Sequence, residues 1–190
     1  MGFSDDELEI AVYGLKRVGM FIGSLIAAAV IGCLTKETSG IFLFLLLFIP
    51  LRIFAGGLHL PSLVSCGVLS SGLLLIVAVI LKFFEASFTP GKTLSACALM
   101  SSIIIAFLAP VSTENKVLFE KEKRRFKTIS VIISSIELGL FFIVQTYIKV
   151  QLLILIVLVT ESLYLLIQTC INIVQKKHND DQQKLLKGAS

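Results

Sequence analysis

The chain has 190 residues, of which 56% are hydrophobic and only 16% are charged, whereas soluble domains are roughly 45–50% apolar. This composition excludes an ordinary soluble domain and predicts an all-α, polytopic membrane protein. The acidic start, MGFSDDELEI, lacks the basic region of a cleavable signal peptide. Insertion is therefore expected to depend on internal segments.

The first segment, residues 1–17, is predicted to be an amphipathic helix. Ser4 is placed as its N-cap, and Glu7 three positions later completes a capping box. One face of this helix is apolar and carries Leu8, Ala11, Val12 and Leu15. A helix of this kind lies along a membrane surface or against a partner helix.

Six apolar segments follow and define a predicted membrane domain over residues 18–174. Their approximate limits are 18–34, 41–51, 63–84, 93–110, 128–147 and 150–174. A spanning helix needs about 20 residues, so the second helix is expected to continue through Arg52 towards Ala55. Residues 175–190 form a polar tail that is expected to be cytoplasmic.

The distribution of Lys and Arg predicts the orientation in the membrane. With six spans, one side carries 13 of the 17 basic residues, in the N-terminus, the 52–62 loop, the 111–127 loop and the tail. The opposite side carries only Lys36, Lys82, Lys92 and Lys149. The positive-inside rule therefore places both termini and the 52–62 loop in the cytoplasm.

The 111–127 loop, VSTENKVLFEKEKRRFK, is the most basic part of the chain. It is open to two interpretations: a nucleic-acid or lipid patch, or a topology-setting loop near anionic headgroups. The second is favoured, and no nucleic-acid partner is expected.

Cysteine and histidine positions single out one stretch, LRIFAGGLHLPSLVSC, at residues 51–66. Three of the four cysteines lie within apolar runs, where a thiol behaves as a small hydrophobe: Cys33, Cys97 and Cys170. Cys66 instead follows His59 closely, and an imidazole that accepts the thiol proton is the minimum for thiol catalysis. Two ligands fall short of a zinc site, and no P-loop is present, so no metal or cofactor is expected.

On one unbroken helix His59 and Cys66 would stand roughly 10.5 Å apart, too far for a hydrogen bond. Gly56 and Gly57 permit the backbone angles that end a helix, and Pro61 suits the start of the next one. His59 is then able to fold back towards Cys66, and the glycine N–H groups are candidates for an oxyanion hole. The spacing by itself also fits a His and Cys pair without a catalytic role.

Two separated motifs resemble the accessory gene regulator B (AgrB) family, the membrane cysteine endopeptidases of Gram-positive quorum sensing. The first is Arg52-x-x-Ala55-Gly56-Gly57-x-His59 followed by Cys66, and the second is Ala109-Pro110-Val111 followed by Asn115-Lys116. The resemblance covers nearly the whole chain. One departure is Val117, where members commonly have proline.

The resemblance implies an endopeptidase that removes the C-terminal part of a short AgrD-like propeptide at the cytoplasmic side of the cell membrane. Cys66 would be the nucleophile and His59 the base. The resemblance implies supporting or substrate-binding positions at Arg52, Gly56, Gly57, Asn115 and Lys116. The products would be cyclic thiolactone or lactone autoinducing peptides, and a homodimer is also implied.

Glu137 and Glu161 lie inside the fifth and sixth predicted spans, where ionised groups are costly and face protein or water. They are open to a functional role, such as binding a basic part of the substrate or orienting His59, or to a structural one. Two rival functions also remain: a small transporter or channel, which explains the glutamates but not the two motifs, and a non-catalytic membrane scaffold.

Overall fold

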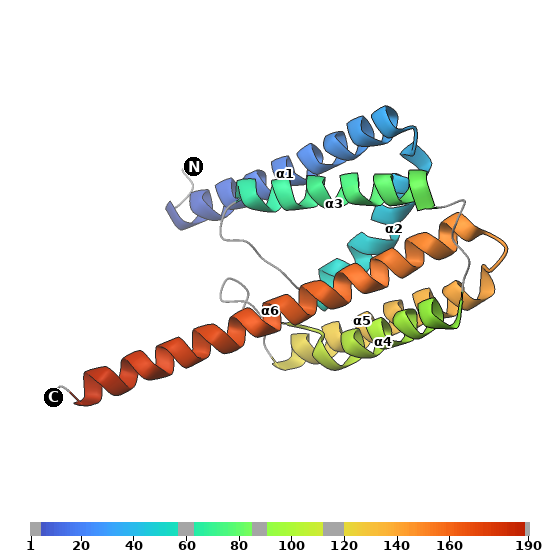
Figure 1. The fold of residues 1–190 in the computed structure, drawn as a ribbon. Helices are drawn as coiled ribbons and strands as arrows, with labels where there is room; N and C mark the ends of the chain where they lie inside the picture. The colour runs from blue at the N-terminus through green and yellow to red at the C-terminus, as the bar shows by residue number, and fades with distance from the viewer. Residues whose placement is uncertain (1–4, 57–62, 85–90, 112–119, 189–190) are drawn as a thin grey trace. The chain divides into compact units, whose positions relative to one another are not determined.

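The computed structural model describes residues 5–56, 63–84, 91–111 and 120–188. Over these ranges the chain forms six helices and no strand (Figure 1), which confirms the all-α prediction. The helices are α1 (Asp5–Thr35), α2 (Thr38–Ala55), α3 (Leu63–Phe84), α4 (Lys92–Leu108), α5 (Glu120–Ile143) and α6 (Ile148–Gly188).

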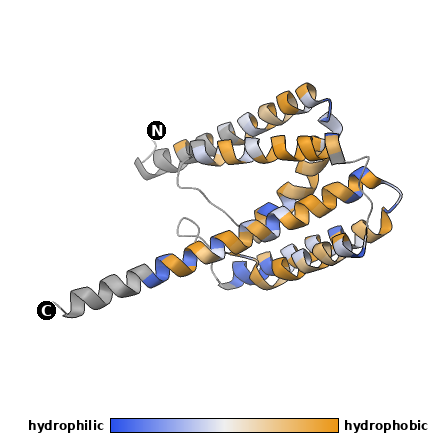
Figure 2. Cartoon of the chain, in the orientation of Figure 1, coloured by the Kyte–Doolittle hydropathy of each residue, from blue (hydrophilic) through white to orange (hydrophobic). Residues whose placement is uncertain are grey.

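Four of these helices contain segments long and apolar enough to cross a membrane: Thr38–Ala55, Ser65–Phe83, Lys121–Ile143 and Ile148–Lys177. The two remaining apolar segments of the six predicted ones are shorter, Phe21–Thr35 and Lys92–Leu108. Figure 2 shows hydrophobic residues along most of α3 and along much of α6. The protein is therefore built mainly of helices suited to a lipid environment.

The helix ends differ from the sequence prediction at three places. The predicted amphipathic helix and first span form one continuous helix, α1, and Ser4 lies outside the described residues. Helix α5 begins at Glu120, so the basic run expected in the 111–127 loop belongs to its first turns. Lys, Arg and Glu are strong helix formers, which explains the earlier start. Helix α6 continues through the predicted tail to Gly188.

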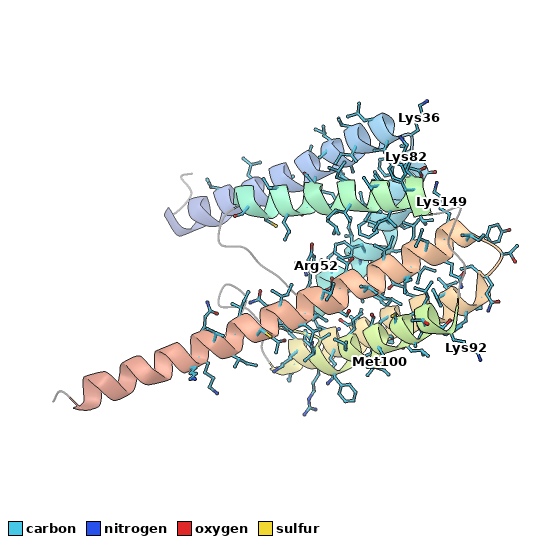
Figure 3. All side chains as sticks on the ribbon, in the orientation of Figure 1. Lys36, Arg52, Lys82, Lys92, Met100 and Lys149 are labelled. Atoms are coloured by element: carbon cyan, nitrogen blue, oxygen red, sulfur yellow. The ribbon has the colours of Figure 1, made fainter. Side chains whose placement is uncertain are left out.

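The chain divides into two compact units, Met1–Phe42 with Leu60–Ser87, and Leu43–His59 with Phe88–Ser190. In the first unit α1 and α3 lie side by side and run in the same direction (Figure 1). Lys36 and Lys82 lie together at the C-terminal end of this pair (Figure 3).

Helix α1 ends in a tight turn that starts α2. The Glu37 N–H donates to the Gly32 carbonyl at 3.0 Å, and Lys36 adopts a left-handed conformation with φ 64°. This is the Schellman arrangement, in which the residue after the helix is usually glycine. Gly32 leaves room for the returning chain, since a Cβ there would lie 2.9 Å from the Thr38 Cα.

In the second unit α4, α5 and α6 pack against one another. The inward face of α5 is polar at three positions, Ser130, Ser134 and Glu137, and all three are buried. At the α5–α6 turn the buried Gln151 Nε2 donates to the Phe141 carbonyl at 3.0 Å. That carbonyl lies in the last turn of α5, where helical carbonyls lack partners within the helix, so Gln151 serves as a cap.

The larger part of α2 belongs to the same unit. Its buried face consists of Phe44, Phe48, Leu51 and Ala55. Aromatic contacts join it to the other helices: the Phe48 and Tyr164 rings lie 6.3 Å apart, and the Phe54 and Phe126 rings 5.6 Å apart. These contacts place the C-terminal end of α2 beside the first turns of α5 and the middle of α6.

Candidate active site

The C-terminal end of α2 is joined to the segment that follows α4. The Val111 N–H donates to the Ala55 carbonyl at 3.2 Å, and Gly56 and Val111 form an isolated parallel bridge. The chain after α4 reaches this point through a cis Ala109–Pro110 peptide bond. Two motifs that are far apart in the sequence are therefore hydrogen-bonded to each other, and we call this contact the α2–Val111 clamp.

Gly56 is required by the geometry of the clamp. Its φ is +81°, a conformation that residues with a Cβ rarely adopt, and a Cβ there would lie 2.8 Å from the Val111 carbonyl oxygen. The Gly56 N–H donates to the Arg52 carbonyl at 3.2 Å and so continues the helical pattern by one bond. This N–H is already engaged and is not the free donor that an oxyanion hole needs.

Arg52 lies in the last turn of α2, beside α6 (Figure 3), and holds three groups at once. Its Nη1 donates to the Gly56 carbonyl at 3.0 Å and lies 3.7 Å from Glu161 Oε2. Its guanidinium carbon also lies 4.7 Å from the centre of the Tyr164 ring, within the range of a cation–π interaction.

The ion pair is strongly asymmetric in its exposure. The Arg52 side chain is 23% exposed, whereas the Glu161 side chain is 0% exposed. Neither carboxyl oxygen of Glu161 has a hydrogen-bond partner among the described residues. An ionised carboxylate in such surroundings is costly unless it is paired, so Arg52 is the group that compensates the charge of Glu161.

Cys66 lies in the first turn of α3 and is partly exposed. The other three cysteines lie exposed at later positions of α1, α4 and α6, and all four are free thiols: Cys33, Cys66, Cys97 and Cys170. The first-turn location distinguishes Cys66 from the others.

Four of the residues expected at the site lie outside the described residues: Gly57, His59, Asn115 and Lys116. The approach of His59 to Cys66 therefore stays a prediction. Within the described ranges, no group of three or more His, Cys, Asp or Glu side chains is placed to hold a metal ion.

The contacts that hold Arg52 were not predicted from the sequence. The role of Glu161 was left open there, and Tyr164 was not among the expected site residues. One signal was present: an arginine in the last turn of a spanning helix and a glutamate inside another span each require a partner.

The comparisons with known proteins agree with the motifs. The sequence model of the family described as accessory gene regulator B matches residues 2–184. No curated protein and no solved structure matches the chain. A match over nearly the whole length, together with the clamp between the two motifs, establishes that this chain belongs to the accessory gene regulator B family, whose members take part in the processing of quorum-sensing peptides.

Proposed function

We propose that this protein is a membrane-embedded cysteine endopeptidase. It cleaves the C-terminal part from a short AgrD-like propeptide through a thioester intermediate, and the retained part becomes a cyclic autoinducing peptide. Cys66 is the nucleophile, and His59 is the general base and then the general acid.

The α2–Val111 clamp is the observation that carries the proposal. The chain continues from Gly56 to Gly57 and His59, and from Val111 to Asn115 and Lys116. Because Ala55 and Val111 are hydrogen-bonded, both motif segments begin from one point of the second unit. Residues that follow two segments joined at one point are well placed to act on the same substrate.

The position of Cys66 supports its role as nucleophile. The Cys66 side chain is partly exposed, and an exposed thiol is accessible to a peptide. Of the four cysteines, Cys66 alone lies in the first turn of a helix.

In the first step His59 takes the proton of the Cys66 thiol, and the thiolate attacks the carbonyl carbon of the scissile peptide bond. A tetrahedral intermediate forms, and its collapse breaks the C–N bond. The His59 imidazolium gives its proton to the departing amine. The C-terminal fragment leaves, and the N-terminal part stays on Cys66 as a thioester.

In the second step a Cys or Ser of the bound propeptide attacks the thioester carbonyl. Its proton passes through His59 to the Cys66 sulfur, which leaves as the thiol. Exchange of a thioester for a thiolactone roughly conserves bond energy, so the step needs no nucleotide. Water has to be excluded from the acyl-enzyme, and a site among apolar helices meets that need.

The proposed location is the cytoplasmic face of the cell membrane, with both termini and the 52–62 loop in the cytoplasm. In the second unit Lys92 and Lys149 lie at one end (Figure 3), and the basic first turns of α5 lie at the other. This separation supports the orientation predicted from the positive-inside rule. The bilayer and the propeptide are the partners, and two copies of the chain form a homodimer.

Mass spectrometry of the purified protein with a candidate propeptide tests the proposal. The wild type is expected to release a C-terminal fragment and to carry a thioester adduct on Cys66. Neither product is expected from Cys66→Ala or His59→Ala, and Cys97→Ala is a matched control that keeps both products.

No cleavage of any cognate propeptide by a folded wild type would refute the proposal. Full activity of Cys66→Ala would refute it as well. Transport that is lost in Glu137→Gln and kept in Cys66→Ala would instead support the small transporter.

A further inference from the structure

We propose that Glu161 is a positioning residue for the cleavage reaction. Acting through Arg52, it fixes the turn at Gly56 from which the segment that carries His59 departs. This inference rests on the proposed function, and it adds a residue that neither motif contains.

One atom of Arg52 links Glu161 to the turn at Gly56. Arg52 Nη1 lies 3.7 Å from Glu161 Oε2 and donates to the Gly56 carbonyl at 3.0 Å. A guanidinium is planar and rigid, so a carboxylate that attracts Nη1 also determines where the hydrogen bond to Gly56 points.

The peptide plane that follows Gly56 connects this hydrogen bond to the rest of the chain. The carbonyl of a residue and the N–H of the next residue lie in one plane. The bond from Arg52 to the Gly56 carbonyl therefore sets the direction in which the chain leaves α2. The bridge between Gly56 and Val111 holds the other side of the turn.

The exposure of Arg52 makes the ion pair important for its orientation. Arg52 is partly exposed, so its charged head has access to solvent. The buried Glu161 carboxyl and the Tyr164 ring hold the guanidinium against α6 instead. Loss of the charge of Glu161 weakens the attraction that holds the guanidinium against α6, and with it the orientation of the bond to the Gly56 carbonyl.

A role of the Arg52–Glu161 pair in stability alone is the weaker explanation. Desolvation offsets much of the attraction in a buried ion pair, and apolar residues of similar volume often stabilise a protein as well or better. Stability alone therefore does not account for the pair, whereas orientation of the Gly56 carbonyl requires the charged geometry that apolar residues lack.

Single-turnover formation of the Cys66 thioester, measured against propeptide concentration, tests the proposal. Glu161→Gln is expected to lower the limiting rate by at least about tenfold, because a misplaced base weakens proton transfer. The half-saturating propeptide concentration should change by less than about twofold, since binding is not affected. The matched control Glu137→Gln, which neutralises a second buried carboxyl, should stay within about twofold of the wild type in both quantities.

A limiting rate of Glu161→Gln near the wild-type value would overturn the proposal. So would an equal loss in Glu137→Gln, because the effect would then belong to any buried carboxyl. A change confined to the half-saturating concentration would overturn it too, since it would assign Glu161 to substrate binding.

The exchange variant Arg52→Glu/Glu161→Arg separates positioning from stability. It restores an ion pair, so its thermal unfolding temperature should return towards the wild-type value. Glutamate at position 52 has no donor for the Gly56 carbonyl when ionised, so the limiting rate should remain at least about tenfold low. Recovery of the rate would mean that the pair serves stability alone, and the proposal would fail.

Tyr164→Leu provides a second route if Glu161→Gln does not fold. It keeps both charges and removes the ring beneath the guanidinium, together with the contact of that ring with Phe48. A cation–π contact of this kind predicts a loss of about threefold to tenfold in the limiting rate. An unchanged rate in a folded Tyr164→Leu protein would overturn the proposal.

The pH profile of Cys66 alkylation by iodoacetamide distinguishes failure of this inference from failure of the proposed function. If the dyad exists, Cys66 of the wild type should react at lower pH than Cys66 of His59→Ala. The profile of Glu161→Gln should then move towards that of His59→Ala.

Identical profiles of the wild type and His59→Ala would refute the dyad, and with it the proposed function. If these two profiles differ and Glu161→Gln follows the wild type, the positioning role of Glu161 alone is refuted.

Discussion

Replacement of Gly56 by alanine tests the α2–Val111 clamp directly. Gly56 has φ +81°, and the added Cβ would lie 2.8 Å from the Val111 carbonyl oxygen. The obstacle is backbone, so it cannot rotate away as a flexible side chain would. Either α2 or the Val111 segment has to move.

The cost follows from two contributions. A residue with a Cβ in the left-handed region costs about 1–2 kcal/mol. Displacing Val111 loses or lengthens the 3.2 Å hydrogen bond to the Ala55 carbonyl, which contributes about 0.5–1.5 kcal/mol. Together they predict a fall of about 1.5–3.5 kcal/mol in the free energy of unfolding.

Circular dichroism of the detergent-solubilised protein during denaturant titration measures this loss. Gly139→Ala is the matched control, because Gly139 lies within α5 and a Cβ there meets nothing within 4 Å. Alanine within a helix should stabilise the protein by up to about 1 kcal/mol. A Gly56→Ala protein within about 0.5 kcal/mol of the wild type would refute the role of the clamp.

Three further substitutions test local features by the same titration. Gly32→Ala should lower the free energy of unfolding by about 1–3 kcal/mol, because its Cβ would meet the Thr38 Cα at 2.9 Å; an unchanged value would show that the turn relaxes freely. Lys36→Gly should raise it by up to about 1 kcal/mol, since φ is 64° there; a decrease would contradict this account of the turn. Gln151→Leu should lower the free energy of unfolding by about 1–2 kcal/mol, because it removes the cap on the Phe141 carbonyl. Equal stability would mean that another donor replaces the amide.

Local patterns predicted most of the helices. The second apolar run was too short to span a membrane, and this placed the end of its helix near Ala55, where α2 does end. Gly56 marked the end of this helix correctly. The start of α5 was predicted too late because apolar runs alone defined the spans, although a basic segment such as Lys121–Lys127 is also helix-forming.

Contacts between distant residues were not predictable in the same way. Hydrophobic periodicity assigns faces to helices, but it does not state which charged side chain meets which. The pairing of Arg52 with Glu161, and of Ala55 with Val111, depends on how α2, α4 and α6 pack. The motifs pointed to Arg52 and Gly56 as important positions, and only the structure supplies the contacts that explain them.

The Arg52–Glu161 pair also has a consequence for biosynthesis. Arg52 leaves the ribosome roughly 110 residues before Glu161, a delay of about 5–20 s at usual rates of synthesis. Throughout that time the arginine at the end of α2 has no carboxylate from α6, whereas its bond to Gly56 requires only its own helix. The nascent chain is therefore able to form the bond from Arg52 to Gly56 early, and the ion pair with Glu161 is added only when the last membrane helix has been made.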